Sequence, residues 1–461
     1  MFLLLSTAGC LLTMNGCGGS AKTLLTQSQI QHIVIVFQEN RTPDNLFQDA
    51  VLIAHGADIA SSGVNSEGLT IPLSPIDLGT VGSIPQNYDL SHYHSAFLQM
   101  YDGGKMDGAD LIACTPAANC PPNAPPNPQF RYVKPSDVQP YFTLAEQYTF
   151  GDRMFQTNQG PSFPAHQFIL SGTSAPTATS NLFASENPAP GDGNAGCIAP
   201  TGTIVRLIDP SGTELSSQYP CFEHPTLTDL LDAKGISWRY YAPTAGSIWT
   251  APGAIQHMCQ PQTQNGQLVC TGSDWSNVII PQTHILTDIA NNQLPSVTWV
   301  IPRGQTSDHP WSNDGSGPSW VASIVNAIGN SSYWSSTAII ITWDDWGGWY
   351  DHVAPPQVLA NCAQWGCGYV YGFRVPLIVV SPYAKAAYIS HTPHDFGSIL
   401  KFIEEEFGLS SLGYADANSL DDLSDCFNFN QTPLKFQTIP APENGEHFLN
   451  DRTPPTDPDD D

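Results

Sequence analysis

The sequence predicts an α/β fold in which a mostly parallel sheet is covered by helices on both faces, as a three-layer α/β/α sandwich. Two observations lead to this prediction. Short, continuous apolar runs rich in β-branched residues are typical of strands that are buried on both faces. Segments with helical spacing of their apolar residues lie between these runs, and strands that alternate with helices are typical of a parallel sheet.

The predicted elements follow one another along the chain. Strands are expected at 33–37, 297–301, 338–342 and 376–380, with a weaker candidate at 236–241. A helix is expected to open at Thr226, because Thr226 and Asp229 have the spacing of a capping box, and to end near Gly235. Further helices are expected at 319–328 and 394–407, and Gly408 is a typical helix stop.

The charge balance excludes some partners. Acidic residues outnumber basic residues by 42 to 15, and the formal net charge is -27. A nucleic-acid-binding protein needs a basic surface, which this composition does not supply, so no nucleic-acid binding is expected. An anionic substrate would need a strong local positive charge, such as a metal ion.

The N-terminus indicates export from a bacterial cell. Residues 1–14 are largely apolar, too short to cross a bilayer, and resemble the core of a signal peptide. Cys10 and Cys17 each follow a small residue, as at a lipoprotein cleavage site, and an ordinary cleaved signal is the alternative. A lipidated Cys17 would tether the protein to a membrane. Either reading places the protein in the periplasm, on the outer membrane or in the medium.

The chain divides into four predicted parts. We expect a signal at 1–17, a tether at 18–30, one catalytic domain at 31–440, and an acidic, proline-rich tail at 441–461. The end of that tail, from Pro454 on, has the composition of a disordered segment.

The cysteines fit an oxidising compartment. Four sets are close in sequence and predict local disulfides, with Cys426 left over: Cys114/Cys120, Cys197/Cys221, Cys259/Cys270 and Cys362/Cys367. A zinc site is the alternative, although no tight C-x-x-C pair occurs.

Polar residues follow three of the predicted strands. They are Glu39 and Asn40, Asp308 and His309, and Asp344 and Asp345. Ligands of open parallel sheets bind beyond the carboxyl ends of the strands. Carboxylate and amide oxygens suit a divalent cation, either calcium or a transition metal. The alternatives are a capped turn at Glu39-Asn40 and a solvated loop at Asp344-Asp345.

Ser162 is a candidate nucleophile. Gly160 and Pro161 precede it, and Pro164 suits the first turn of a helix, so Ser162 is predicted at a helix N-terminus. Free N–H groups there favour an anion, although a simple N-cap role is the alternative. No G-x-S-x-G motif occurs, which argues against the triad of α/β-hydrolases.

Histidines are numerous, 13 against 15 lysines and arginines. Histidine is a natural general acid for a leaving alkoxide. His92 and His94 precede the segment 102–108, which contains Lys105, while His309 follows Asp308, and His352 lies in the segment after Asp345.

Six segments, in the same order along the chain, resemble the bacterial phosphoesterase family that contains the non-specific phospholipases C and a respiratory-burst-inhibiting acid phosphatase. The segments are 32–41, 103–108, 160–162, 308–310, 342–353 and 371–376.

The resemblance implies an alkaline-phosphatase-like α/β/α fold and assigns residue roles. It implies a metal held by Glu39, Asn40, Asp344 and Asp345, with Ser162 beside it as both ligand and nucleophile. It further implies a phosphate pocket lined by these candidates: His92 or His94, Asp308 and His309, with Lys105 and His352 as further candidates.

The chain departs from the family pattern at three places. Thr42-Pro43-Asp44 stands where the family usually has Ser-Phe-Asp, and Asp345 stands where many members have Glu. The segment after Ser162 often contains Pro-Asn-Arg, whereas here it is Phe163-Pro164-Ala165-His166.

The sequence therefore predicts an exported, metal-dependent phosphoesterase that acts on phosphate mono- or diesters through a phosphoserine. A phospholipid, a nucleotide and a sugar phosphate are all open as substrates. One alternative is a sulfate-ester hydrolase, although Ser162 lacks the Arg of the Cys/Ser-x-Pro-x-Arg motif. The other is a surface lipoprotein that binds without hydrolysis.

Overall fold

The computed structural model describes residues 29–79, 88–115, 120, 124–191, 193–358 and 370–456. The predicted signal at 1–17, most of the tether at 18–30 and the Cys362/Cys367 pair lie outside these residues. Among the described residues, every helix falls short of the length and apolar character that a membrane crossing needs.

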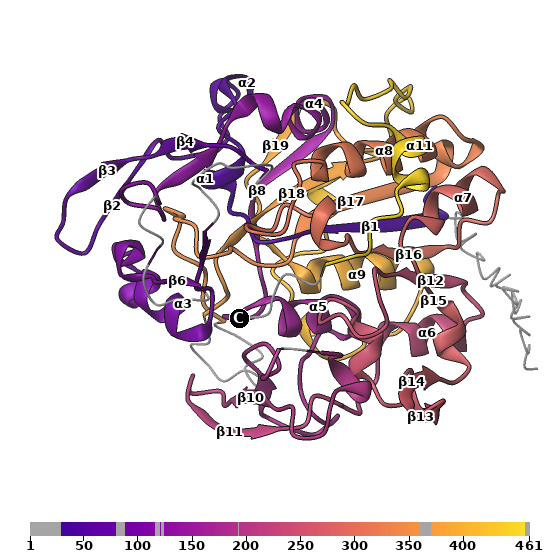
Figure 1. The fold of residues 1–461 in the computed structure, drawn as a ribbon. Helices are drawn as coiled ribbons and strands as arrows, with labels where there is room; N and C mark the ends of the chain where they lie inside the picture. Colours follow the sequence, from indigo (N-terminus) through magenta and orange to yellow (C-terminus); the bar gives the residue numbers. More distant parts are fainter. Residues whose placement is uncertain are drawn as a thin grey trace, which may run out of the picture.

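A mixed, mostly parallel sheet forms the centre of the molecule (Figure 1). Its strands, in spatial order, are β15 (Val278–Ile279), β12 (Trp238–Tyr241), β16 (Val297–Val300), β1 (His32–Gln38), β17 (Thr337–Trp343), β18 (Arg374–Val380), β8 (Thr149–Phe155) and β19 (Tyr388–Ser390), with β20 (His394–Asp395) beside β8. All five predicted strands are confirmed. β1 lies between β16 and β17 and runs parallel to both.

The sheet is mostly parallel, as predicted, and contains one antiparallel strand among those described, β18. β18 runs antiparallel to β17 and to β8, because an apolar run shows burial but not direction. β8 was missed because Gly151, Asp152 and Arg153 interrupt its apolar pattern. Gly151 leaves room for Leu377 of β18, since a Cβ at residue 151 would lie 2.9 Å from that side chain.

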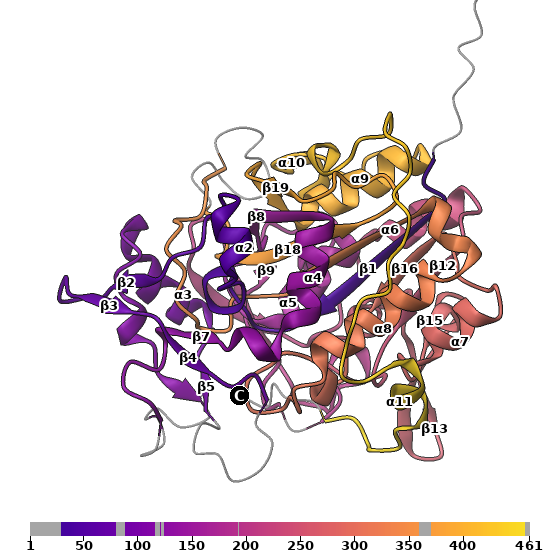
Figure 2. The ribbon, with the colours of Figure 1, turned by 90° about the horizontal axis from the view of Figure 1, so that it is seen from above.

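Helices cover both faces of the sheet, which confirms the three layers (Figures 1 and 2). One layer contains α2 (Ala50–Ala54), α4 (Gln139–Gln147), α7 (His284–Ala290), α8 (Gly317–Gly329) and α11 (Gly445–Asn450). The other contains α5 (Ser162–Ser171), α6 (Leu227–Ala233), α9 (Phe396–Phe407) and α10 (Ala415–Asn418).

The predicted helix ends are largely confirmed. Thr226 and Asp229 form the capping box of α6, and Gly408 ends α9 in the left-handed conformation, with φ 61°. α9 begins two residues later than predicted, because Asp395 caps it and pairs with β8 as part of β20.

Smaller elements build a lobe beside the sheet, at the left of Figure 1. They are α1 (Pro43–Leu46), β2 (Ser62–Val64), β3 (Thr70–Pro72), β4 (Ser74–Ile76), β5 (Asp89–Leu90), α3 (His94–Tyr101), β6 (Cys114–Thr115) and β7 (Arg131–Val133). Part of this lobe has its own core, which includes Trp346, Trp349 and Phe373. These aromatic residues follow β17 or precede β18, so they join the lobe to the sheet.

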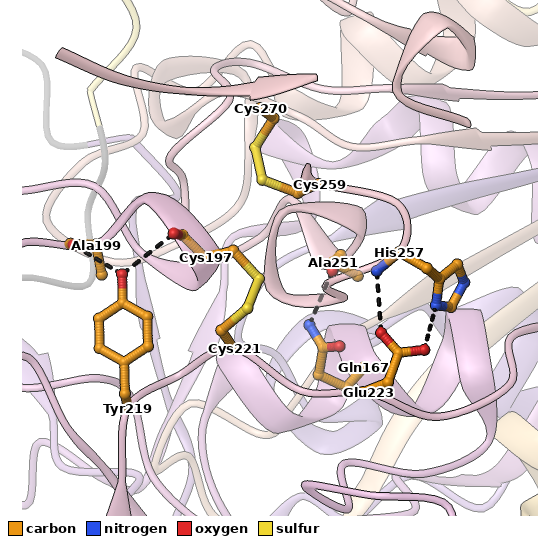
Figure 3. The surroundings of a disulfide bond; sticks show 10 residues. All are labelled: Gln167, Cys197, Ala199, Tyr219, Cys221, Glu223, Ala251, His257, Cys259 and Cys270. Atoms are coloured by element: carbon orange, nitrogen blue, oxygen red, sulfur yellow. Dashed lines mark hydrogen bonds and ion pairs between the residues drawn. A yellow bond between two sulfur atoms is a disulfide. The ribbon is translucent and has the colours of Figure 1, made fainter. Parts of the chain in front are cut away.

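Disulfides link loops in two places, one at β6 of the lobe and two on the α5 side of the sheet. The described residues contain the predicted pairs Cys114–Cys120, Cys197–Cys221 and Cys259–Cys270, and Cys426 is buried and free. The second and third pairs lie close together (Figure 3) and share one apolar cluster. They border the strands β9 (Phe183–Ala184), β10 (Val205–Ile208), β11 (Glu214–Gln218), β13 (Gln260–Gln264) and β14 (Gln267–Thr271).

The segment after residue 440 packs against the domain as far as residue 456. The ring of Phe448 is buried against Trp320, with centroids 5.3 Å apart. Arg303 donates to the carbonyl of Thr453 at 2.9 Å and pairs with Asp451. The apolar contact of Phe448 and the pairing of the buried Arg303 therefore hold this acidic, proline-rich segment against the domain.

Replacing Phe448 with Ala is expected to lower the free energy of unfolding by about 3 kcal/mol, because the change removes a buried ring and leaves a cavity. Urea unfolding measures this. The control is Leu449→Ala on the same helix, where the side chain is 37% exposed, and a change within about 0.5 kcal/mol is expected there. Equal effects of the two variants would show that the segment does not pack as described.

Candidate active site

The carboxyl ends of β1 and β17 bring four polar residues together. Gln38 pairs in register with Trp343, so the residues that follow each strand lie side by side. They are Glu39, Asn40, Asp344 and Asp345, and each is 0% exposed. Carboxylates buried this close together repel one another unless a cation or shared protons offset their charge.

Asp344 is held by backbone groups on one oxygen. Its Oδ1 accepts from the N–H of Asn40 at 3.0 Å and from the N–H of Asp345 at 2.7 Å. Asn40 has a φ of 61°, a left-handed conformation that asparagine tolerates. Asp344 Oδ2 is buried, without a hydrogen-bond partner among the described residues, and lies 3.8 Å from His166 Nε2.

The two oxygens of Asp345 also have different surroundings. Oδ1 accepts from the N–H of Gly347 at 2.7 Å, and Oδ2 accepts from the Ser162 hydroxyl at 3.2 Å. Gly347 has a φ of 62°, and a Cβ there would lie 2.4 Å from the carbonyl oxygen of Asn40. Only glycine fits this close turn, which fixes Asp345 against Ser162.

Ser162 is the first residue of α5, as the sequence predicts. Pro161 occupies the N-cap position, and the next free N–H, that of Phe163, donates to Asn187 Oδ1 at 2.9 Å. The cap is thus supplied by Asn187 rather than by Ser162. The Ser162 hydroxyl is directed to Asp345 instead.

His166 completes this group, and sequence reasoning missed it as a site residue. Its Nε2 lies 3.3 Å from Glu39 Oε1. Its ring stacks on Trp249, with centroids 6.3 Å apart, and contacts Phe37 at 5.2 Å. The signal was present, because a spacing of four residues places Ser162 and His166 on one face of a helix.

His92 and His309 lie next to each other, with ring centroids 6.1 Å apart. His92 Nδ1 lies 2.8 Å from the carbonyl of Leu90, and His309 Nδ1 lies 2.6 Å from the carbonyl of Pro310. A carbonyl only accepts, so Nδ1 carries the proton in both rings. His92 Nε2 then accepts from the Asn40 amide nitrogen at 3.3 Å. The amide oxygen, Asn40 Oδ1, therefore points away from His92.

Asp308 is buried and is held by hydrogen bonds from three side chains. Its Oδ2 accepts from the Tyr141 hydroxyl at 3.0 Å and from Trp343 Nε1 at 2.9 Å. Its carbonyl accepts from Arg41 at 2.6 and 2.9 Å. Burial raises the pKa of Asp308 to about 6, and the Arg41 charge acts in the opposite direction. Asp308 therefore positions the adjacent His309.

Three further candidates have contacts elsewhere. Lys105 pairs with Asp102 at 2.5 Å on the surface. The His94 ring stacks on Phe97, and the residue lines a cavity with Phe168 and Phe183. His352 bonds to Asp44 at 2.7 Å and to Asp58 at 2.9 Å.

Two groups of side chains have the spacing of metal ligands. In the first, donor atoms of Glu39, His166 and Asp344 lie within 4.8 Å of one another, and the second contains Asp44, Asp351 and His352. The second group already holds a buried cation, because Arg374 bonds to both Asp351 and Asp44. The first group has buried oxygen donors and fits a divalent cation, and Asn40 Oδ1 nearby is buried without a hydrogen-bond partner among the described residues.

A model of the Phosphoesterase family matches residues 30–410. The chain belongs to this family. The match spans β1 to α9 and so includes every residue of the site. It confirms the family resemblance that the sequence indicates.

The curated relatives of the chain include bacterial phospholipases C. The chain is 24% identical to the hemolytic phospholipase C of Pseudomonas aeruginosa over 83% of this chain and 53% of the relative. It is 25% identical to phospholipase C B of Mycobacterium tuberculosis over 88% of this chain and 79% of the relative. The chain thus spans about half the length of the two Pseudomonas relatives, 53% and 57%.

Solved structures with weak similarity include a protein in the alkaline phosphatase superfamily from Vibrio parahaemolyticus. Its TM-score is 0.35 at 11% identity, covering 86% of this chain and 71% of that chain. A lipoteichoic acid synthase from Listeria monocytogenes has a TM-score of 0.33 at 11% identity, covering 61% and 70%.

The stability of the protein is expected to depend on pH through His352. Burial lowers the pKa of His352, but Asp44 and Asp351 outweigh burial and raise the pKa from 6.5 to about 9. A raised folded-state pKa stabilises the protein below the unfolded value, and this gain is lost as the pH rises through the folded value. His352→Gln should therefore lower the free energy of unfolding at about pH 6 and have less effect near about pH 10.

Urea unfolding of both proteins at the two pH values measures this difference. The control is His447→Gln, an exposed histidine on α11. A His352→Gln effect that does not shrink with rising pH would contradict the charged pairing.

Proposed function

We propose that the protein is a metal-dependent phosphoesterase that hydrolyses phosphate mono- or diesters through a phosphoserine at Ser162. The contact of the Ser162 hydroxyl with Asp345 Oδ2 at 3.2 Å, at the start of α5 and beside the buried carboxylates, carries the proposal. Membership of the Phosphoesterase family and the phospholipase C names of the relatives support it.

In this proposal Glu39, Asn40, Asp344 and Asp345 hold a divalent cation beside Ser162. A cation there supplies positive charge for phosphoryl oxygens and lowers the pKa of the seryl hydroxyl. Asp345 Oδ2 accepts the hydrogen bond from Ser162 and so directs the Oγ lone pairs away from the carboxylate. The Ser162 oxygen then attacks phosphorus, its proton passes to Asp345 Oδ2, and the ester bond to the alcohol breaks.

In this proposal His309 exchanges the proton of the leaving alcohol. Its Nδ1 is fixed on the Pro310 carbonyl, so Nε2 is the atom that gains and loses a proton. In the first step His309 donates this proton to the alkoxide. In the second it takes a proton from the water that attacks the phosphoserine. Asp345 then returns its proton to the Ser162 oxygen as phosphate or a phosphomonoester leaves. His92 is occupied by Asn40 and orients that amide.

The proposal also includes the substrate class and the location of the protein. The names of the relatives favour a phosphodiester with a lipid alcohol over a nucleotide or sugar phosphate. The three disulfides among the described residues support export, because such bonds persist in oxidising compartments. Lipidation of Cys17 would add a membrane tether.

Ser162→Ala is expected to reduce turnover by at least about 10³-fold, because no other group supplies the attacking oxygen. The substrates are p-nitrophenyl phosphate and p-nitrophenyl phosphorylcholine, and a chelator should abolish activity on whichever is cleaved. Mass spectrometry of acid-quenched wild type should find the phosphoryl group on Ser162.

The matched control is Ser171→Ala, a buried serine at the other end of α5. Near-normal turnover by Ser162→Ala would refute the nucleophile assignment. A folded wild type that binds metal but cleaves neither substrate would favour a binding protein instead.

A further inference from the structure

We propose that His166 is itself a ligand of the metal ion, so that the site selects a transition metal that accepts nitrogen, such as zinc, rather than calcium. The inference shares with the proposed function only the assumption that a cation binds at Glu39 and Asp344. Serine catalysis is not needed for it.

The donor atoms have the separations of ligands to one ion. His166 Nε2 lies 3.3 Å from Glu39 Oε1 and 3.8 Å from Asp344 Oδ2. Two ligands bonded at about 2.1 Å to a tetrahedral zinc ion are separated by about 3.4 Å. The three donors converge from three different elements. Glu39 follows β1, Asp344 follows β17, and His166 lies in α5.

The His166 ring is held in this orientation by its surroundings. Trp249 stacks on it, and the carbonyl of Trp249 accepts from the Tyr240 hydroxyl of β12 at 2.7 Å. The neighbouring Gln167 donates to the carbonyl of Ala251 at 3.3 Å, which ties α5 to the same loop beside the disulfides (Figure 3). A preorganised ligand loses little entropy when a metal binds.

The donor set also distinguishes between metals. Calcium takes six to eight oxygen ligands, whereas zinc and related ions bind imidazole nitrogen together with carboxylate. His166 therefore adds a neutral nitrogen ligand to the two carboxylates.

A simpler arrangement would have His166 as a hydrogen-bond donor to Glu39, with the metal bound by oxygen alone. The two arrangements differ in what the bound ion contacts, so the test has to examine the ion directly. The full chain is stripped with a chelator and reloaded with zinc, manganese or calcium.

X-ray absorption at the zinc edge of the loaded wild type should show scattering from the carbons of an imidazole, and His166→Gln should lose it. Titration of the stripped proteins should give zinc binding that is weaker by about 100-fold or more in His166→Gln, because a direct ligand is removed. Calcium should stabilise the wild type against heat less than zinc does.

The control is His257→Gln, a partly exposed histidine that bonds to Glu223 at 2.9 Å in the same region (Figure 3), and its zinc binding should match that of wild type. Zinc bound by oxygen alone, with equal affinity in His166→Gln, would overturn the inference and leave the proposed function standing. Failure of the wild type to bind any of these ions would overturn both. Should His166→Gln not fold, the absorption spectrum of the wild type still decides, since it reports imidazole directly.

Discussion

The parallel pairing of β1 with β17 is the constraint on which the site depends. It places Glu39 beside Asp344 with both side chains out of solvent. Burying carboxylates is unfavourable unless each is compensated. Backbone N–H groups compensate one oxygen of Asp344 and one of Asp345, and the left-handed turns at Asn40 and Gly347 aim those groups. Of the other two oxygens, Asp345 Oδ2 accepts from the Ser162 hydroxyl and Asp344 Oδ2 lies 3.8 Å from His166 Nε2.

Buried arginines tie the loops at the carboxyl edge of the sheet to the scaffold. Arg41, only 1% exposed, donates to the Asp308 carbonyl and lies over the ring of Trp349 at 5.2 Å. Burial lowers its pKa to about 10, and the Asp308 charge opposes this decrease. Arg374 binds Asp351 and Asp44 in a similar way. Because a guanidinium keeps its charge when buried, these contacts hold the loops after β1, β16 and β17 in one arrangement.

Much of the fold could be predicted from sequence, because strands buried on both faces have a distinct apolar pattern and helix ends have distinct caps. The meeting of Glu39 with Asp344 followed from the rule that ligands bind beyond the strand ends. The role of Asp308 could not be predicted, because only the fold shows that its carboxylate faces Tyr141 and Trp343. His166 was missed because its helix could be predicted, whereas the neighbours of each face of that helix could not.

The net charge of -27 disfavours the approach of an anionic substrate to the site. A phosphate ester approaching this surface meets acidic charge, and the carboxylates at the strand ends would repel it further. Lys105 cannot offset this charge, because it pairs with Asp102 on the surface. Under the proposed function the attraction has to come from the bound cation and the N-terminal end of α5. That helix carries both Ser162 and His166, so one rigid element would place the attacking oxygen relative to the ion.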